Sequence, residues 1–311
     1  MKFGIALESF TPPGRTPDVG SILKCAVEAE SLGFESIWLW DHLLLGSKRV
    51  YPVLESLTTL AYIGARTSTV KLATGVLILA LRKPLVVAKM ISTIQFLTGG
   101  RLIIGCAAGW YEREFRATGT DFHKRGRLFE ETYLLVKKLL SSQDVTYNSE
   151  DFVIEHATLE PRHSTPIPML IGGYSDAALK RVGRISDGWV SYYYKPEDFL
   201  DSWKKVESSA ISSGRDPVEL DRVDIVPLAI STSKDKGMNE ALEFTRAYMD
   251  LPKNTACSFE SSIVGDVKDC VDQIRKYEEA GVERLVFIPV KYDIDQIEKA
   301  GKEILPAFIK K

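Results

Sequence analysis

An Asp-His pair at positions 41 and 42 offers the side chains best suited to acid–base chemistry. Imidazole titrates near neutral pH, so His42 is the best proton donor or acceptor in a chain with only 4 histidines. The other three, His123, His156 and His163, lie in segments that we expect to be a loop or an insertion. A structural alternative stays open, in which Asp41 and His42 only cap a loop by binding backbone donors.

A glycine-rich segment offers a place for an anion. Gly172, Gly173, Tyr174 and Ser175 join an apolar run to a helical one, and Ser175 is placed to cap the helix. Glycine lets a ligand approach the backbone, and the first turn of a helix attracts negative charge. The segment therefore predicts a phosphate or phosphodiester site that Lys180 or Arg181 could steer, although a plain strand-to-helix turn would use the same residues.

Two further segments place small residues near the ends of apolar runs. Gly75 and Val76 lie inside the run 70–78, where glycine weakens a strand and indicates a bulge. Ala107, Ala108 and Gly109 stand at the end of the run 102–107 and would let a ligand approach the backbone there. Trp110 comes next, either as an apolar wall of a site or as a core residue at the start of a helix.

These segments need a fold that brings their ends together. Eight short apolar runs are expected to be strands: residues 3–7, 36–40, 70–78, 102–107, 167–171, 188–191, 223–230 and 285–289. Helical patterns lie between them, near 18–32, 53–66, 84–97, 124–142, 175–185, 196–213, 236–250, 266–280 and 292–309. Asp18, Ser175 and Asp266 are expected N-caps, and Pro84 and Pro196 suit a first helical turn.

This alternation of uninterrupted apolar runs with helices favours an α/β fold, a (β/α)8 TIM barrel, formed as a single domain over residues 1–311. An open Rossmann-like sheet is the runner-up, but no G-x-G-x-x-G follows the first run. The segment of about 143–166 lacks helical period and is expected to form a hairpin inserted before the fifth strand. In such a barrel the site lies at the carboxyl ends of the strands. Residues 41–42, 75–76, 107–110 and 172–175 should therefore meet at one rim.

The predicted strand ends also exclude some chemistry. They are rich in glycine and aromatic residues and poor in carboxylates, so we expect no metal site. No lysine is placed to form a Schiff base at a strand end. Aromatic walls with close backbone approach instead favour a large, flat organic cofactor.

Composition narrows the class of protein. The formal net charge is -2, which gives no reason to expect nucleic acid or a membrane surface as a partner. The longest uncharged apolar stretch, residues 72–81, is about half of what a transmembrane helix needs. No signal peptide is evident at the start. Cys25, Cys106, Cys257 and Cys270 lie far apart in the sequence, without the spacing of a zinc site or a disulfide framework, so we expect them to be reduced and buried. We therefore expect a cytoplasmic protein.

Four longer segments make the chain similar to a known family. SLGFESIWLWDHL (31–43), LATGVLILALRKPLVVAK (72–89), LTGGRLIIGCAAGWYEREFRATGTDFHKRGRLFEE (97–131) and PMLIGGYSDAALKRVGRISDGW (168–189) resemble the bacterial-luciferase-like superfamily of flavin- and deazaflavin-dependent oxidoreductases. The resemblance is strongest to enzymes that use coenzyme F420, a 5-deazaflavin that carries hydride, with FMN-dependent monooxygenases as the neighbouring subset.

The resemblance implies roles for particular residues. The aspartate matching Asp41 contacts the cofactor in the deazaflavin enzymes, and the histidine matching His42 acts as acid or base. A non-prolyl cis peptide is implied at Gly75-Val76, pressing against the central ring, with Leu77 and Ile78 behind it. Some members of the resembled family that oxidise sugar phosphates have a glutamate where this chain has Trp110, and the difference argues against a sugar phosphate as the substrate.

The expected function is therefore an oxidoreductase that moves hydride between the C5 of coenzyme F420 and a small organic substrate. An FMN-dependent monooxygenase is the first alternative, and a non-catalytic flavin-binding protein is an alternative of another class. Dimers are common in the resembled family, so a homodimer is expected.

Two other groups of residues are given structural or lining roles. Glu112, Glu114, Arg125 and Arg127 are expected to form a salt-bridged turn after the fourth strand. Tyr192, Tyr193 and Tyr194 line either the substrate space or the barrel rim.

Overall fold

The strands close into a parallel barrel in the computed structural model, which describes residues 1–46, 49–248 and 259–308. Around the barrel the strands are β1 (Lys2–Ala6), β2 (Ser36–Leu39), β3 (Lys71–Ile78), β4 (Leu102–Ala107), β7 (Met169–Gly172), β8 (Gly188–Tyr192), β9 (Asp221–Ile230) and β11 (Arg284–Pro289). Each pairs in parallel with its neighbours, and the pairing of β8 with β9 closes the ring. The predicted (β/α)8 barrel is confirmed, and all eight expected runs are strands.

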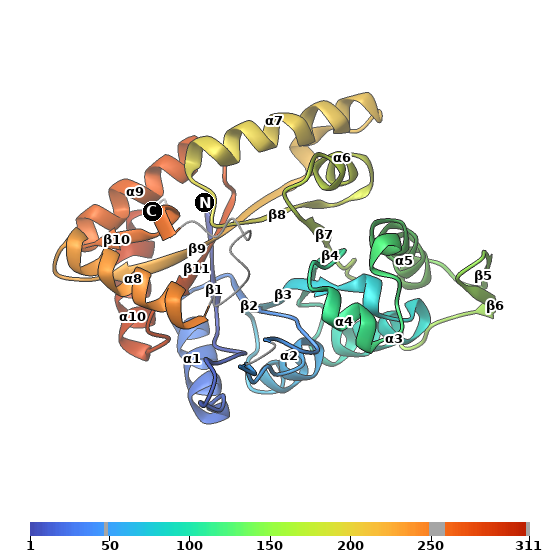
Figure 1. The fold of residues 1–311 in the computed structure, drawn as a ribbon, viewed down its shortest axis with the longest axis horizontal. Coiled ribbons are helices and arrows are strands. Elements are labelled where there is room, and N and C mark those ends of the chain that lie inside the picture. The colour runs from blue at the N-terminus through green and yellow to red at the C-terminus, as the bar shows by residue number, and fades with distance from the viewer. Residues whose placement is uncertain (47–48, 249–258, 309–311) are drawn as a thin grey trace.

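Helices cover the outside of the barrel (Figure 1). They are α1 (Val19–Ser31), α2 (Ser56–Gly64), α3 (Pro84–Leu97), α4 (Glu112–Ala117), α5 (Arg125–Ser141), α6 (Asp176–Ile185), α7 (Pro196–Ser212), α8 (Lys234–Tyr248), α9 (Val267–Glu279) and α10 (Ile294–Lys299). Asp18, Ser175 and Asp266 accept hydrogen bonds from first-turn amides as expected, and Pro84 and Pro196 begin their helices. The short helix α4 and the short strand β10 (Ile263–Gly265), which pairs with β9, were not expected.

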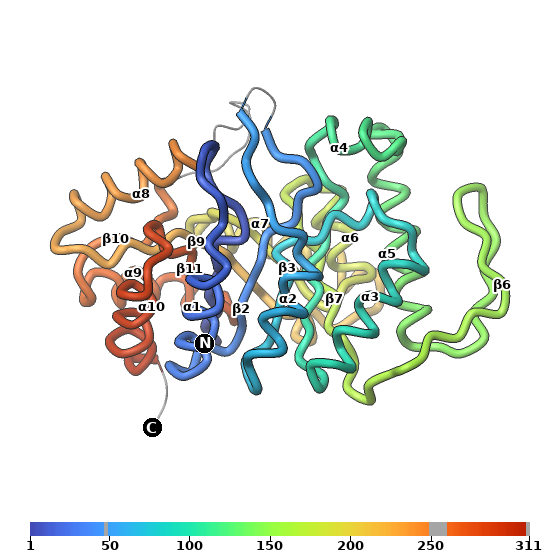
Figure 2. Tube along the Cα trace, turned by 90° about the horizontal axis from the view of Figure 1, so that it is seen from below, coloured from blue at the N-terminus to red at the C-terminus, as the bar shows by residue number. Residues whose placement is uncertain are grey.

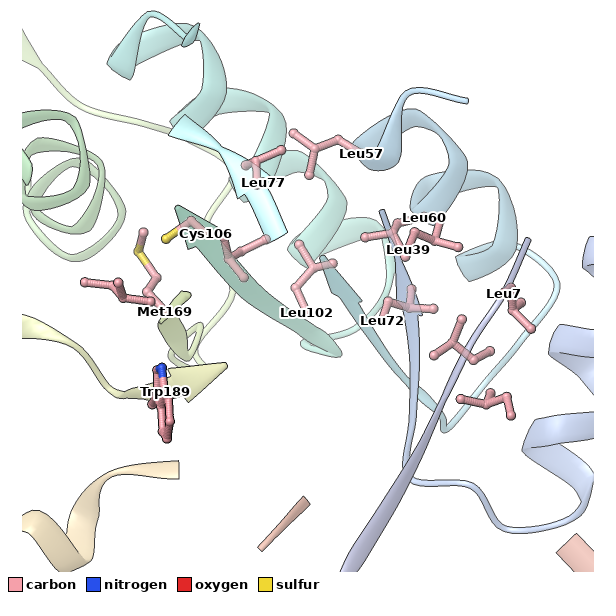
Figure 3. Packing of buried hydrophobic residues seen from close by; sticks show 14 of the residues in the cluster. Leu7, Leu39, Leu57, Leu60, Leu72, Leu77, Leu102, Cys106, Met169 and Trp189 are labelled. Carbon is pink, nitrogen blue, oxygen red and sulfur yellow. The ribbon is translucent and has the colours of Figure 1, made fainter. Parts of the chain in front are cut away.

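Strand residues alternate between two buried layers. Ala73, Ile103, Val190 and Val286 belong to the cluster inside the barrel. Leu39, Leu72, Leu102 and Trp189 belong to the larger cluster between strands and helices, where Leu57 and Leu60 of α2 meet the strand leucines (Figure 3). Burial on both sides explains why the strands are uninterrupted apolar runs in the sequence.

The expected insertion is present as an antiparallel hairpin of β5 (Val145–Asn148) and β6 (Val153–Ala157). It stands away from the barrel beside α5 (Figure 2). Cys25, Cys106 and Cys270 are buried and unpaired, as predicted, while Cys257 lies outside the described residues. Among the described residues, no helix is both long enough and apolar enough to cross a membrane.

Candidate functional site

The carboxyl ends of four neighbouring strands, β2, β3, β4 and β7, form one continuous part of the barrel rim. Parallel pairing places β2 beside β3, β3 beside β4 and β4 beside β7. This order brings together the four segments predicted to form the site, namely residues 41–42, 75–76, 107–110 and 172–175. The sequence prediction of a shared rim therefore agrees with the geometry.

The peptide bond between Gly75 and Val76 is cis, as the resemblance implied. The register between β3 and β4 shifts between Thr74 and Leu77, so a bulge interrupts the strand here. Val76 is half-buried, and a Cβ added to Gly172 would lie 3.0 Å from its Cγ1. The missing side chain of Gly172 therefore makes room for Val76.

Leu77 and Ile78, the two residues after the bulge, do not lie where they were expected. Leu77 and Ile78 are buried, and both belong to the cluster between the strands and the helices. The expectation that they line a cofactor ring is therefore wrong. A strand sends successive side chains to opposite faces, but the bulge changes which residues face the interior.

Asp41 ties the end of β2 to the segment after the bulge. Its fully buried carboxylate accepts hydrogen bonds from the backbone N–H of Ile78 at 2.9 Å and the hydroxyl of Ser56 at 3.1 Å. Arg82 donates to the same carboxylate at 2.8 Å. These contacts agree with the structural alternative for Asp41, and its contact with a cofactor stays a prediction.

His42 forms a pair with a carboxylate that the sequence reasoning assigned elsewhere. Its Nδ1 lies 3.0 Å from Oε2 of Glu114, a residue of α4 whose side chain is 0% exposed. The other oxygen of Glu114 accepts the backbone N–H groups of Leu43 and Leu44. The imidazole ring also meets Trp110 edge to face, with ring centres 5.8 Å apart. A partly exposed imidazole backed by a buried carboxylate is an arrangement suited to proton transfer.

The expectation that Glu112, Glu114, Arg125 and Arg127 form a salt-bridged turn after β4 is wrong. Glu114 binds His42, Glu112 pairs with Arg116, and Arg125 lies over the ring of Phe122. Arg127 instead binds Asp151 and Glu131 near the hairpin. The sequence offered little indication that Glu114 contacts His42, because the two residues are 72 positions apart and Glu114 lies in a helix that was not expected.

Glycine and small residues shape the rest of this rim. Gly109 has a φ of 84°, and a Cβ there would lie 2.6 Å from Ile78, so the close packing of this turn requires glycine. Ala107 and Ala108 are half-buried beside it. Trp110 and Tyr174 expose 38% and 48% of their surfaces at this rim, and the ring of Tyr174 stacks on that of Tyr194 with ring centres 5.5 Å apart.

The turn from β7 into α6 keeps the features of an anion site. Ser175 caps the helix by accepting the N–H of Ala178, and Gly173 has a φ of 143°. The one acidic residue of the first turn, Asp176, is paired with Lys205 at 2.8 Å. Arg181 is bound to Glu130, so of the two predicted steering residues only Lys180 lacks an ion pair among the described residues.

Further aromatic residues lie at the same end of the barrel. Trp40 lies 5.5 Å from Tyr192 between ring centres, and its Nε1 points to the hydroxyl of Tyr292 at 3.4 Å. Tyr248 donates its hydroxyl hydrogen to Glu8, and burial together with this bond raises the pKa of Tyr248. Tyr192 also lies against the bulge, because a Cβ on Gly75 would be 3.1 Å from its hydroxyl oxygen. Sequence reasoning missed Trp40, the aromatic residue just before Asp41 at the end of β2.

A cavity of about 830 Å³ lies at the other end of the barrel, where the strands begin. Lys2, Lys71, Met169, Asp221 and Arg284 are among its lining residues. None of the twelve predicted site residues lines it. In the described part of the chain, no group of three or more His, Cys, Asp or Glu residues could hold a metal ion.

Comparison with known proteins gives a family match and several relatives. The family model described as luciferase-like monooxygenase matches residues 1–261. The F420-dependent glucose-6-phosphate dehydrogenase of Microbacterium testaceum is 26% identical, with 93% of this chain and 94% of that protein covered. The protein of the same name from Kineococcus radiotolerans is 28% identical, with 92% and 81% covered.

Solved structures share the fold. An F420-dependent secondary alcohol dehydrogenase, in complex with an F420-acetone adduct, superposes with a TM-score of 0.83 at 18% identity, covering 99% of both chains. The coenzyme F420 dependent tetrahydromethanopterin reductase of Methanopyrus kandleri gives a TM-score of 0.79 at 23% identity, again covering 99% of both chains. At these identities the structural matches establish the barrel fold alone.

Proposed function

Because the chain belongs to the luciferase-like monooxygenase family, we propose that its rim binds coenzyme F420 and that the protein is an F420-dependent oxidoreductase of a small organic substrate. Relatives that cover more than nine tenths of the chain carry the name of F420-dependent dehydrogenases. The observation that carries the proposal is the bulge between Thr74 and Leu77, set in the middle of a rim that also holds His42, Trp110 and Tyr174.

The residues present fit such a cofactor. The half-buried Val76 and the exposed parts of Trp110 and Tyr174 offer apolar surface for a flat ring. The first turn of α6, with Gly173 and Ser175, offers backbone N–H groups for a phosphodiester, and its one carboxylate is neutralised by Lys205. Ala107, Ala108 and Gly109 let a ligand approach the end of β4 closely.

When bound, coenzyme F420 supplies hydride transfer. The protein's own residues then orient the substrate, exclude water and move one proton. His42 is the group for the proton, since its ring is partly exposed and Nε2 has no hydrogen-bond partner among the described residues. Asp41 contributes by fixing Ile78, two residues after the bulge.

Binding measurements test the cofactor. We expect micromolar affinity for coenzyme F420 in a fluorescence titration, and much weaker binding of FMN. Tight FMN binding without F420 binding would contradict the proposal and favour a monooxygenase. A His42→Ala variant should keep its F420 affinity and lose turnover, with glucose 6-phosphate and propan-2-ol as probes because relatives act on a sugar phosphate and a secondary alcohol. Unchanged turnover in His42→Ala would refute the acid–base role.

A homodimer is part of the proposal, supported by exposed apolar side chains on two adjacent helices. Val86, Phe96 and Leu97 of α3 are 60%, 50% and 71% exposed, and Tyr62 of α2 is 50% exposed. Apolar surface gathered in this way is typical of an interface between subunits. Light scattering should give twice the chain mass, and Val86→Glu with Leu97→Glu should give the monomer. A wild-type monomer would refute it.

A further inference from the structure

Glu114 is a buried carboxylate that touches the proposed acid–base residue without facing the rim itself. Its Oε2 lies 3.0 Å from Nδ1 of His42, and its side chain is 0% exposed. We propose that Glu114 is a positioning residue that keeps Nδ1 of His42 protonated, so that Nε2 is the atom that exchanges a proton with the substrate. The inference rests on the proposed function of His42.

The main chain fixes the orientation of Glu114. Its Oε1 accepts the backbone N–H of Leu43 at 2.5 Å and of Leu44 at 3.1 Å. Backbone N–H groups can only donate, so the atom at this position must be an acceptor. Oε2 of an ionised carboxylate can also only accept, and therefore the hydrogen of the His42 contact belongs to Nδ1. A neutral imidazole carries one N–H, which leaves Nε2 as the acceptor.

The surroundings keep the ring in this orientation. Trp110 meets the imidazole edge to face at 5.8 Å, and 16% of the His42 side chain is exposed. A flipped ring would place a carbon atom opposite Oε2 and lose the hydrogen bond. The neighbouring carboxylate of Asp41 does not compete for the ring, because Arg82, Ser56 and the Ile78 amide bind it.

A Glu114→Gln substitution tests the assignment, because an amide has only one oxygen. The two backbone N–H groups of Leu43 and Leu44 require that oxygen, so the NH2 group must face Nδ1 of His42. Nδ1 then has to accept, and the hydrogen moves to Nε2. The variant should fold, since both backbone donors keep their acceptor, while the tautomer of His42 reverses.

Long-range ¹⁵N–¹H NMR of the protein without cofactor reads the tautomer directly. With 4 histidines in the chain, a His42→Gln variant identifies the signals of His42. We expect Nδ1–H in the wild type and Nε2–H in Glu114→Gln. Glu112→Gln is the matched control, because Glu112 lies on the same helix, is 59% exposed and, within the described part of the chain, forms an ion pair only with Arg116. The control should leave the His42 signals unchanged.

Binding and turnover complete the test. Glu114→Gln should bind coenzyme F420 within about two-fold of the wild type and lose at least about 100-fold in kcat on a probe that the wild type converts. A wild-type His42 protonated at Nε2, or a variant that keeps Nδ1–H, would overturn the inference without needing turnover. Absence of F420 binding in the wild type would instead refute the proposed function and leave the tautomer measurement valid.

Discussion

Removing the Asp41 carboxylate should destabilise the barrel by a large and measurable amount. Asp41 is fully buried and Arg82 is 12% exposed, so Asp41→Ala leaves a nearly buried guanidinium without its closest anion. Breaking such a pair costs about 3–5 kcal/mol. Glu55 lies 3.6 Å from Arg82 and offers a second anion, so we expect the low end, about 3 kcal/mol.

The expected loss of unfolding free energy corresponds to a decrease in the melting temperature, Tm. Globular proteins unfold with an entropy of about 2.1 cal/mol/K per residue, which gives about 0.65 kcal/mol/K for this chain of 311 residues. A loss of about 3 kcal/mol therefore lowers Tm by about 5 °C. The F420 affinity should fall as well, because the Ile78 amide that anchors the segment after the bulge loses its acceptor.

A double-mutant cycle in calorimetry or denaturant unfolding assigns the effect to the pair. Asp41→Ala, Arg82→Ala and the double variant should give a coupling energy of about 2 kcal/mol. The exposed pair Glu112 and Arg116, 3.4 Å apart, is the control and should give less than about 0.5 kcal/mol. A cost below about 1 kcal/mol for Asp41→Ala, or a coupling no larger than the control, would show that Asp41 does not anchor this part of the rim.

Two further changes test other parts of the barrel. Gly172→Ala places a Cβ 3.0 Å from Val76, so it should lower the free energy of unfolding by about 1–3 kcal/mol and weaken F420 binding. Adding Val76→Ala should restore part of the stability, and a single variant as stable as the wild type would contradict the close packing. Burial raises the pKa of Asp224 to about 7. The folded state then keeps a proton that the unfolded state releases, so wild-type stability relative to Asp224→Asn should fall by about 1.4 kcal/mol per pH unit from about pH 4 to 7 and level off above. A pH-independent difference in thermal unfolding would contradict this.

The sequence predicted the barrel well because the strands are buried on both faces. Such strands are short apolar runs that helical patterns separate, and their parallel pairing puts every carboxyl end on one rim. The bulge at Gly75-Val76 was expected from a glycine inside an apolar run, whereas its cis peptide bond was expected only from the family resemblance. The small residues of 107–109 and 172–175 had a local signal because glycine is needed where chains approach closely.

The contacts that complete the site had no such signal. Glu114 reaches His42 across 72 positions from a helix of 6 residues, too short to show a clear helical period. The lack of space for a side chain at Gly172 is also due to a residue distant in the sequence, Val76, and the spacing of residues does not reveal this contact. Side-chain partners across a barrel follow from the three-dimensional packing, and a single sequence records only the local part of it.

The hairpin of β5 and β6 has a practical consequence. Its contacts go to α5, where Glu131 accepts the hydroxyls of Tyr147 at 3.1 Å and Ser149 at 2.5 Å, and it projects beyond the barrel (Figure 2). Val153 on this arm is 65% exposed. The hairpin is therefore a suitable place to attach a fluorophore or a surface linker without changing the rim that is proposed to bind the cofactor.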